Sequence, residues 1–362
     1  MARKRRNKGK VTETVDLSNS TQSEKEKMLN SLIWDLESKF GKWIITKKDQ
    51  VNKVPTISTN IKTLDSILWW WLPVWRIVEI YWAESSGKTT FSLHMAAMSQ
   101  KDWWNVAYID MEQAVSPEWA SKLWVDMSKL VLSQPDFWEQ AWDLLLELTK
   151  SWLFNLIIVD SVAAMIPKAE LEWEMEDQQM WLQARMLWKL LRKLTPIANK
   201  TWTTIIFINQ TRQKIWVMFG SPETTPWGNA LKFAASQRIK IFKKDKITEN
   251  DTEVGYYMKF QTIKNKITFP KQDTAVKFLN WQFDYLEDLI EYLVKQWKIK
   301  KAWAFLSIII DWEEYKGQGK EKFKQLIIEN NLYDYLYNLT WEAEQNHNDI
   351  EVDEEEILED VE

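Results

Sequence analysis

The sequence contains no cysteine among its 362 residues. Disulfide bonds and zinc sites built on cysteine thiolates are therefore excluded. The sequence also lacks the long apolar run of a membrane-spanning helix, and its basic N-terminus, MARKRRNKGK, is not followed by the apolar stretch of a signal peptide. We therefore expect a protein of the cytoplasm that does not enter a membrane.

Glycine is as scarce as tryptophan is abundant. The chain has 8 glycines and 25 tryptophans, whereas glycine makes up about 7% of an average protein. Tryptophans stand in turn-like settings such as LWWWLPVWR at 68–76, KDWWNV at 101–106 and KLWVD at 122–126, where a residue that takes a positive φ easily is usual. We hypothesise that the source organism reads the codon UGA as glycine, and that many of these tryptophans are glycines in the natural protein.

The alternative is a protein that is truly rich in tryptophan, and some of the tryptophans are genuine even under the recoding hypothesis. Four positions argue against a wholly genuine set. Trp71, Trp75, Trp82 and Trp227 each stand where we expect the backbone to turn tightly or to approach a ligand. The codons TGG at these four positions would contradict the recoding hypothesis.

Charge is concentrated at the two ends of the chain. Residues 342–362 contain eleven acidic and no basic residues, and six basic residues lie within the first ten, although the formal net charge is only −5. Residues 11–341 are thus formally neutral, so any nucleic-acid surface must be a local patch. We expect both tails to be disordered.

The pattern of apolar residues predicts an α/β protein. Apolar residues at helical spacing predict an amphipathic helix over 24–40, which needs a partner surface. Further along, expected strands alternate with expected helices, which is typical of a doubly wound, mostly parallel sheet. The strands are expected at 77–81, 106–110, 156–160 and 204–209, and the helices at 89–99, 138–150 and 178–199.

The C-terminal part has a different character. From about residue 284 a helical pattern is followed by a possible hairpin, which predicts a small α/β domain that ends near residue 341. The expected division is a basic tail at 1–23, a helical arm at 24–50, a core at 51–283, this small domain at 284–341 and an acidic tail at 342–362.

The segment WAESSGKTT at 82–90 matches the phosphate-binding loop G-x-x-x-x-G-K-[ST] if its first position is counted as glycine. In such a loop backbone N–H groups cradle phosphate oxygens at a helix N-terminus, Lys88 neutralises the β- and γ-phosphates, and the Thr89 hydroxyl joins the Mg²⁺ shell. A serine-rich turn is the alternative, and the expected strand before and helix after the segment argue against it.

Three polar residues follow the ends of expected strands, at the edge where open α/β folds bind their ligands. Asp160 closes LIIVD, Glu112 lies two residues past the strand end at Asp110, and Gln210 follows TIIFIN. Asp160 would order Mg²⁺ through water, Glu112 would orient and deprotonate the attacking water, and Gln210 would sense a γ-phosphate. The alternatives are a helix cap for Asp160, a surface carboxylate for Glu112 and a satisfied turn residue for Gln210.

Five segments resemble the bacterial RecA family in sequence and in order: VEIYWAESSGKTT, AYIDMEQAVSP, LIIVDSVAAMIPKAE, FINQTRQKIWVMFGSPETTPWGNALKF and IKNKITFP. The resemblance covers roughly residues 24–335, and its most specific part is 209–233. It implies a RecA-like P-loop ATPase core with a mostly parallel sheet, an N-terminal helical arm and a small α/β C-terminal domain. It also implies an ATP-driven DNA repair protein that polymerises on single-stranded DNA, pairs it with a homologous duplex and exchanges strands.

The resemblance also assigns the nucleotide site. The ATP-binding positions it implies are Trp82, Ala83, Glu84, Ser85, Ser86, Gly87, Lys88, Thr89, Thr90, Trp119 and Asp160. Among these, Thr89 and Asp160 would hold Mg²⁺. The residues that would carry catalysis are Glu112, Lys88, Gln210 and, reaching ATP across a subunit interface as an arginine finger does, Lys264 and Lys266.

The remaining implied roles concern partners. Two loops, at 172–181 and 211–228, would grip the DNA backbone, which suits an activity that accepts any sequence. The residues implied near DNA are Met180, Arg185, Arg192, Arg212, Lys214, Trp227, Gly228 and Asn229. Phe233 would join Lys264 and Lys266 at the interface of a helical homopolymer, the 24–40 helix would pack on the neighbouring subunit, and the acidic tail would compete with DNA. A LexA-like repressor, induced to cleave itself, is a further implied partner.

Departures from the family pattern leave rival interpretations open. Trp82 replaces the loop's first glycine, Ala83 its usual proline, Gln113 a common histidine and Trp119 a tyrosine that stacks on adenine. Tryptophans on family glycines in the DNA loops support recoding: Trp173, Trp181, Trp216 and Trp227. The rivals are another ATPase on this core, such as a RadA-like helicase, which usually carries a four-cysteine zinc module, or a circadian-clock-type ATPase, and an inactive scaffold, which Trp82 would permit.

Overall fold

The computed structural model describes residues 22–40, 56–68, 72–164, 180–213, 223–224, 230–267 and 269–340. The chain divides into two compact units, residues 1–54 and 55–362. In the first unit the described part is the helix α1 (Gln22–Phe40), which confirms the predicted helix. Its side chains Met28, Leu29, Leu32 and Phe40 are 49% to 56% exposed. Both expected tails lie almost wholly outside the described residues.

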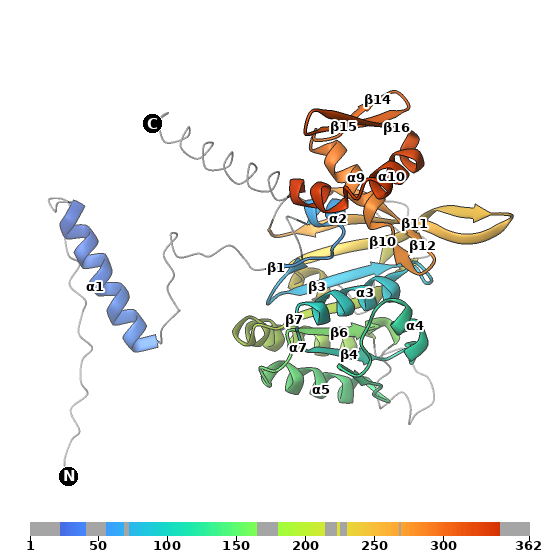
Figure 1. The fold of residues 1–362 in the computed structure, drawn as a ribbon. Coiled ribbons are helices and arrows are strands. Elements are labelled where there is room, and N and C mark those ends of the chain that lie inside the picture. The colour runs from blue at the N-terminus through green and yellow to red at the C-terminus, as the bar shows by residue number, and fades with distance from the viewer. Residues whose placement is uncertain are drawn as a thin grey trace, which may run out of the picture. The chain divides into compact units, whose positions relative to one another are not determined.

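The second unit is built around a nine-stranded sheet (Figure 1). Its strands are β3 (Ile77–Trp82), β4 (Val106–Asp110), β5 (Leu130–Ser133), β6 (Leu156–Asp160), β7 (Thr204–Gln210), β10 (Gln237–Glu249), β11 (Thr252–Asn265), β12 (Asp273–Leu279) and β13 (Gln282–Phe283). Their order is β13-β12-β11-β10-β3-β7-β6-β4-β5. Neighbours from β10 to β5 are parallel, and β11 to β13 continue the sheet as antiparallel strands. The predicted mostly parallel sheet is confirmed.

Helices cover both faces of the sheet. They are α2 (Lys62–Ile67), α3 (Lys88–Lys101), α4 (Pro117–Lys122), α5 (Trp138–Lys150), η2 (Val162–Ala164), α7 (Met180–Thr201) and α8 (Ala230–Ala234). One apolar cluster joins α2 and α3 to one face, and a second joins α5, α7 and α8 to the other. Successive residues of β6 alternate between these clusters, and all five are buried, because strand side chains point to opposite faces in turn. The two short strand pairs are β1 (Thr56–Ile57) with β2 (Leu72–Pro73) and β8 (Arg212–Gln213) with β9 (Glu223–Thr224).

The C-terminal segment has an apolar cluster of its own. Its elements are α9 (Tyr285–Lys295), β14 (Lys300–Ala302), β15 (Phe305–Ile310), β16 (Glu313–Gln318), α10 (Gly319–Glu329) and a helical region at 333–340. The predicted helix is α9, and the expected hairpin is a three-stranded antiparallel sheet. The third strand, β14, has only three residues, KKA, so it carries no alternating apolar pattern that could have predicted it.

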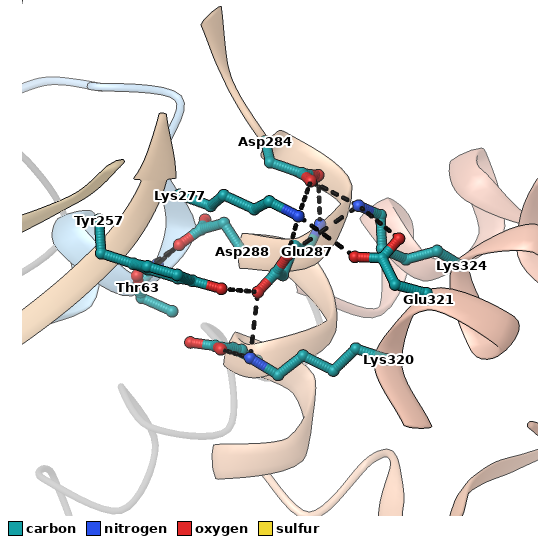
Figure 2. Close-up of polar contacts among 10 residues, drawn as sticks. Thr63, Tyr257, Lys277, Asp284, Glu287, Asp288, Lys320, Glu321 and Lys324 are labelled. Carbon is teal, nitrogen blue, oxygen red and sulfur yellow. Dashed lines mark hydrogen bonds and ion pairs between the residues drawn. The ribbon is translucent and has the colours of Figure 1, made fainter. Parts of the chain in front are cut away.

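A cluster of ion pairs joins α9 to the core and to α10 (Figure 2). Glu287 on α9 is buried and lies 3.5 Å from the Lys277 ammonium on β12 and 3.1 Å from Lys320 on α10. Nearby, the buried Asp288 accepts hydrogen bonds from the backbone and hydroxyl of Thr63 on α2. Burial raises the pKa of Asp288 to about 7. These polar contacts tie α9 to β12, α2 and α10.

Left-handed backbone occurs repeatedly at tryptophan. Among the residues that the structure describes, nine tryptophans have a positive φ: Trp75, Trp103, Trp124, Trp152, Trp202, Trp281, Trp297, Trp303 and Trp312. A bulky residue in this region is strained because its Cβ crowds the following carbonyl oxygen, at a cost of about 1–2 kcal/mol. Glycine has no such penalty.

Two hairpin turns give further evidence for glycine at tryptophan positions. The loops Asn280–Trp281, between β12 and β13, and Asp311–Trp312, between β15 and β16, have two residues each, all with positive φ. Such two-residue turns favour Asn-Gly and Asp-Gly strongly. The structure therefore supports glycine at these tryptophan positions.

The four tryptophans named from the sequence as poor fits to their positions do not all have a positive φ. Trp75 has a φ of 61°, as the recoding hypothesis requires. Trp82 ends β3, and its ring packs toward Phe242, with the Lys240 ammonium 3.5 Å from a ring centroid. The expectation that Trp82 crowds the phosphate loop is therefore not met by its side chain. Trp71 and Trp227 lie outside the described residues.

Candidate functional site

The phosphate loop connects β3 to α3, as the sequence predicts. Gly87 caps α3 with a φ of 95°, a left-handed conformation that favours glycine. The Lys88 ammonium donates to the carbonyls of Ala83 at 2.6 Å and Trp82 at 3.2 Å. Burial lowers the pKa of Lys88, while Asp160, Glu112 and Glu84 oppose that shift. A cation is thus held by two backbone carbonyls of the loop at the N-terminus of α3, and a helix N-terminus of this kind is a phosphate-binding arrangement.

Thr89 and Asp160 meet beside this loop. The Thr89 hydroxyl donates to Asp160 Oδ2 at 2.7 Å, and the Tyr108 hydroxyl donates to the same oxygen at 2.8 Å. Burial raises the pKa of Asp160 to about 6, against the effect of these two hydrogen bonds. Hydroxyl and carboxylate oxygens are hard donors suited to Mg²⁺, which proteins bind through one or two side chains together with phosphates. No cluster of three or more His, Asp or Glu ligands is found among the described residues.

Glu112 and Gln210 are brought together from two different strand ends. The Gln210 side-chain amide donates to Glu112 Oε1 at 2.7 Å, and the Ser161 hydroxyl donates to the same oxygen. The loop that carries Glu112 is shaped by Asp110, which accepts from the backbone N–H groups of Ala114 and Val115. Glu112 itself is exposed toward the cavity. The site therefore holds a carboxylate with a directed amide donor beside it.

These groups line one cavity of about 940 Å³, within the size range of cofactor and ligand sites. The predicted residues that line it are Glu84, Ser85, Ser86, Gly87, Lys88, Thr89, Thr90, Glu112, Trp119, Asp160 and Gln210. Trp82 and Ala83 are not among the lining residues, and their carbonyls contact Lys88 instead. The second wall comes from the β10–β13 region and was not expected from the sequence: Lys243, Glu253, Val254, Gly255, Tyr256, Phe278, Asn280 and Trp281.

The predicted interface residues lie together on another part of the second unit. The Lys264 ammonium donates to the carbonyls of Lys232 and Phe233 at 2.6 and 3.2 Å. Phe233 is exposed and meets the ring edge of Trp188, and Lys266 is exposed as well. Neither lysine lines the cavity, so within one chain these residues do not join the nucleotide site.

Only part of the predicted DNA-binding set can be placed. Arg185 and Arg192 are exposed on α7. Met180 begins α7 and Arg212 begins β8. Lys214, Trp227, Gly228 and Asn229 lie outside the described residues, as do most positions of both expected DNA loops.

A family model and several known proteins match this chain in sequence. The model of the RecA N-terminal domain matches residues 27–282. Protein RecA of Streptomyces rimosus is 41% identical over 318 residues, which cover 85% of this chain and 82% of that protein. Protein RecA of Acinetobacter baylyi is 42% identical over 314 residues, with 84% and 88% covered. The crystal structure of the RadB recombinase matches 63% of this chain and 98% of that chain with 22% identity and a TM-score of 0.49.

The parallel sheet, the phosphate loop and the strand-end carboxylates define a nucleotide-hydrolysing P-loop ATPase. Its match to the family model spans more than half of the chain. The chain belongs to the RecA family and is a recombination and DNA repair protein. Among the residues that the structure describes, no helix combines the length and the apolar character needed to cross a bilayer.

Proposed function

We propose that this protein is a Mg²⁺-dependent ATPase that forms helical filaments on single-stranded DNA, where DNA stimulates ATP turnover. The filament pairs its strand with a homologous duplex and exchanges strands, in the cytoplasm. The observation that carries the ATPase part is the contact of Gln210 with Glu112 at the mouth of the loop that holds Lys88. Family membership supports the DNA part.

Each residue has a separate task in this proposal. Lys88 and the loop N–H groups bind the β- and γ-phosphates, and Trp119 stacks on the base. Glu112 orients the attacking water and accepts its proton, while Gln210 holds the Glu112 carboxylate and senses the γ-phosphate. Thr89 and Asp160 would hold Mg²⁺, which neutralises phosphate charge when bound.

The neighbouring subunit completes the site in this proposal. Lys264 and Lys266 lie away from the cavity of their own chain, so they act on the ATP of the adjacent subunit, as an arginine finger does. Phe233 and α1 pack on that neighbour, and the exposed apolar side chains of α1 supply the surface. The domain boundaries predicted from the sequence, with the core at 51–283 and the small domain at 284–341, are retained in this proposal.

DNA binding depends on the loops at 172–181 and 211–228 in this proposal. Arg185 and Arg192, together with Met180, Arg212, Lys214, Trp227, Gly228 and Asn229, contact the phosphodiester backbone, and the acidic 342–362 tail competes with DNA for them. ATP stabilises the extended DNA-binding filament and hydrolysis releases it. The filament also induces self-cleavage of a LexA-like repressor.

The test is ATP turnover measured with and without single-stranded DNA, with Mg²⁺ present and after its removal with EDTA. We expect DNA to stimulate turnover strongly and EDTA to abolish it. A non-hydrolysable ATP analogue should strengthen binding to single-stranded DNA. Turnover that DNA does not change would favour a RadA-like or clock-type ATPase, and the absence of nucleotide binding would favour a scaffold.

A further inference from the structure

The sheet contains a buried ion pair that lies outside the ATP cavity. Glu79 on β3 is fully buried, and Arg238, its neighbour in register on β10, is 8% exposed. The Arg238 guanidinium donates to Glu79 Oε2 and lies 4.4 Å from the ring centroid of Tyr81. Burying a pair of charges costs several kcal/mol of desolvation, and apolar residues of similar volume are often as stable. Stability alone therefore does not account for this pair.

The second oxygen of Glu79 connects the pair to the next strand. Glu79 Oε1 accepts a hydrogen bond from Asn209 Nδ2 at 2.9 Å, and Asn209 on β7 is fully buried. A carboxylate only accepts hydrogen bonds, so the amide nitrogen of Asn209 must face Glu79. The amide oxygen then faces the other way and accepts from the backbone N–H of Gln210 at 3.0 Å.

Gln210 is the point where this row of contacts reaches the site. Its side-chain amide donates to Glu112, and its backbone ends β7 beside Trp82, the end of β3. A continuous series of hydrogen bonds thus runs from Arg238 through Glu79 and Asn209 to Gln210. Every member before Gln210 is buried, so water does not compete with these bonds.

We propose that Glu79, Arg238 and Asn209 form a buried brace that positions Gln210 against Glu112. Arg238 orients the Glu79 carboxylate, Glu79 orients the Asn209 amide, and Asn209 holds the backbone at Gln210. The brace residues are not among those that line the cavity, and they act through Gln210. The catalytic consequence rests on the proposed function of Gln210 and Glu112, whereas the positioning itself does not.

Two double variants separate positioning from general stability. E79M/R238M and E79Q/R238M both remove the ion pair and keep side chains of similar volume, but only the E79Q substitution leaves an oxygen that accepts from Asn209 Nδ2. In E79M/R238M we expect hydrogen exchange at the backbone amide of Gln210 to accelerate about tenfold, which is the effect of one lost hydrogen bond. In E79Q/R238M exchange should stay within about threefold of the parent. Exchange at residues 205–208 serves as the control for global unfolding.

Kinetics give the second readout. With E79M/R238M we expect kcat for ATP to fall about tenfold while the dissociation constant of a fluorescent ATP analogue stays within about twofold. E79Q/R238M should restore kcat. N209S removes the Asn209 amide, the member of the brace that contacts Gln210. It should reproduce the effects of E79M/R238M, and it provides a second test if E79M/R238M folds poorly.

The two failures are distinguishable. Equal exchange at Gln210 in the two double variants, or acceleration that extends equally over residues 205–208, would overturn the brace. A parent protein without ATP turnover would instead refute the proposed function, and the exchange measurement would still decide whether the brace positions Gln210.

Discussion

Replacing strained tryptophans by glycine should stabilise the protein. Trp303 and Trp312 have φ values of 54° and 70° and are 100% and 101% exposed. Glycine at these positions removes backbone strain of about 1–2 kcal/mol and loses no buried side chain. The greater freedom of glycine in the unfolded chain offsets about 0.4–1 kcal/mol. We therefore expect W303G and W312G each to raise the free energy of unfolding by about 0.5–1 kcal/mol.

The two sites lie before and after β15, so their effects should add in the double variant. Urea denaturation of the parent, both single variants and W303G/W312G measures this. W142G is the matched control, because Trp142 is buried on α5, has no positive φ and packs on Phe207. We expect W142G to lose about 3–5 kcal/mol from the vacated volume and about 1 kcal/mol more from helix propensity.

If W303G and W312G raise the free energy of unfolding and W142G lowers it, the fold favours glycine at some tryptophan positions and tryptophan at others. Loss of stability in both W303G and W312G would refute the reasoning from backbone strain, and the recoding hypothesis would lose its structural support. The gene gives an independent answer, since TGG codons at left-handed positions would contradict recoding directly.

Three further changes test the site and the fold. E112Q should lower ATP turnover at least about 100-fold while the dissociation constant of a fluorescent ATP analogue stays within about twofold; unchanged turnover would contradict the role of Glu112. Burial lowers the pKa of His94 to about 4, below about 6.5 when unfolded, so stability should fall as pH drops from about 6.5 to about 4. In urea titrations over this pH range, the free energy of unfolding of H94Q should fall by about 3 kcal/mol less than that of the parent. Parallel pH curves for the two proteins would contradict this role of His94. E287A removes a buried carboxylate, while Lys277 keeps Glu321 and Lys320 keeps Glu291 as partners. This change should cost about 1–3 kcal/mol, against at most about 0.5 kcal/mol for E147A at an exposed pair; equal losses would contradict the cluster's role.

The strand-end half of the site could be predicted because its signal is local. An apolar strand that ends in a polar residue places that residue at one edge of a parallel sheet, and Asp160, Glu112 and Gln210 all line the cavity there. Lys88 and Thr89 follow from the loop pattern. Their mutual contacts, such as Gln210 with Glu112, depend on strand order, which periodicity does not reveal.

The opposite wall of the cavity could not be predicted. Tyr256 and Phe278 belong to the antiparallel strands β11 and β12. Their ring centroids lie 5.4 Å apart, and both residues line the cavity beside the phosphate loop. No strand was predicted from the sequence at β11 or β12, and a periodic pattern would not say which cavity a long hairpin covers. The brace was missed for a similar reason, since Glu79 and Arg238 are 159 residues apart and become neighbours only through the parallel pairing of β3 with β10.

Tryptophans in this chain fall into separate physical classes, and recoding must therefore be judged position by position. Trp312 is exposed in a turn that favours glycine, whereas Trp142 is buried on the inner face of α5. Trp82 belongs to neither class, because β3 is extended there and the ring packs outside the cavity on Lys240. An altered Trp82 would thus act on ATP binding through the backbone that carries the carbonyl facing Lys88. Stability measurements can therefore show whether glycine is favoured at the turn positions. At Trp82 in the phosphate loop, only a measurement of nucleotide binding can show this.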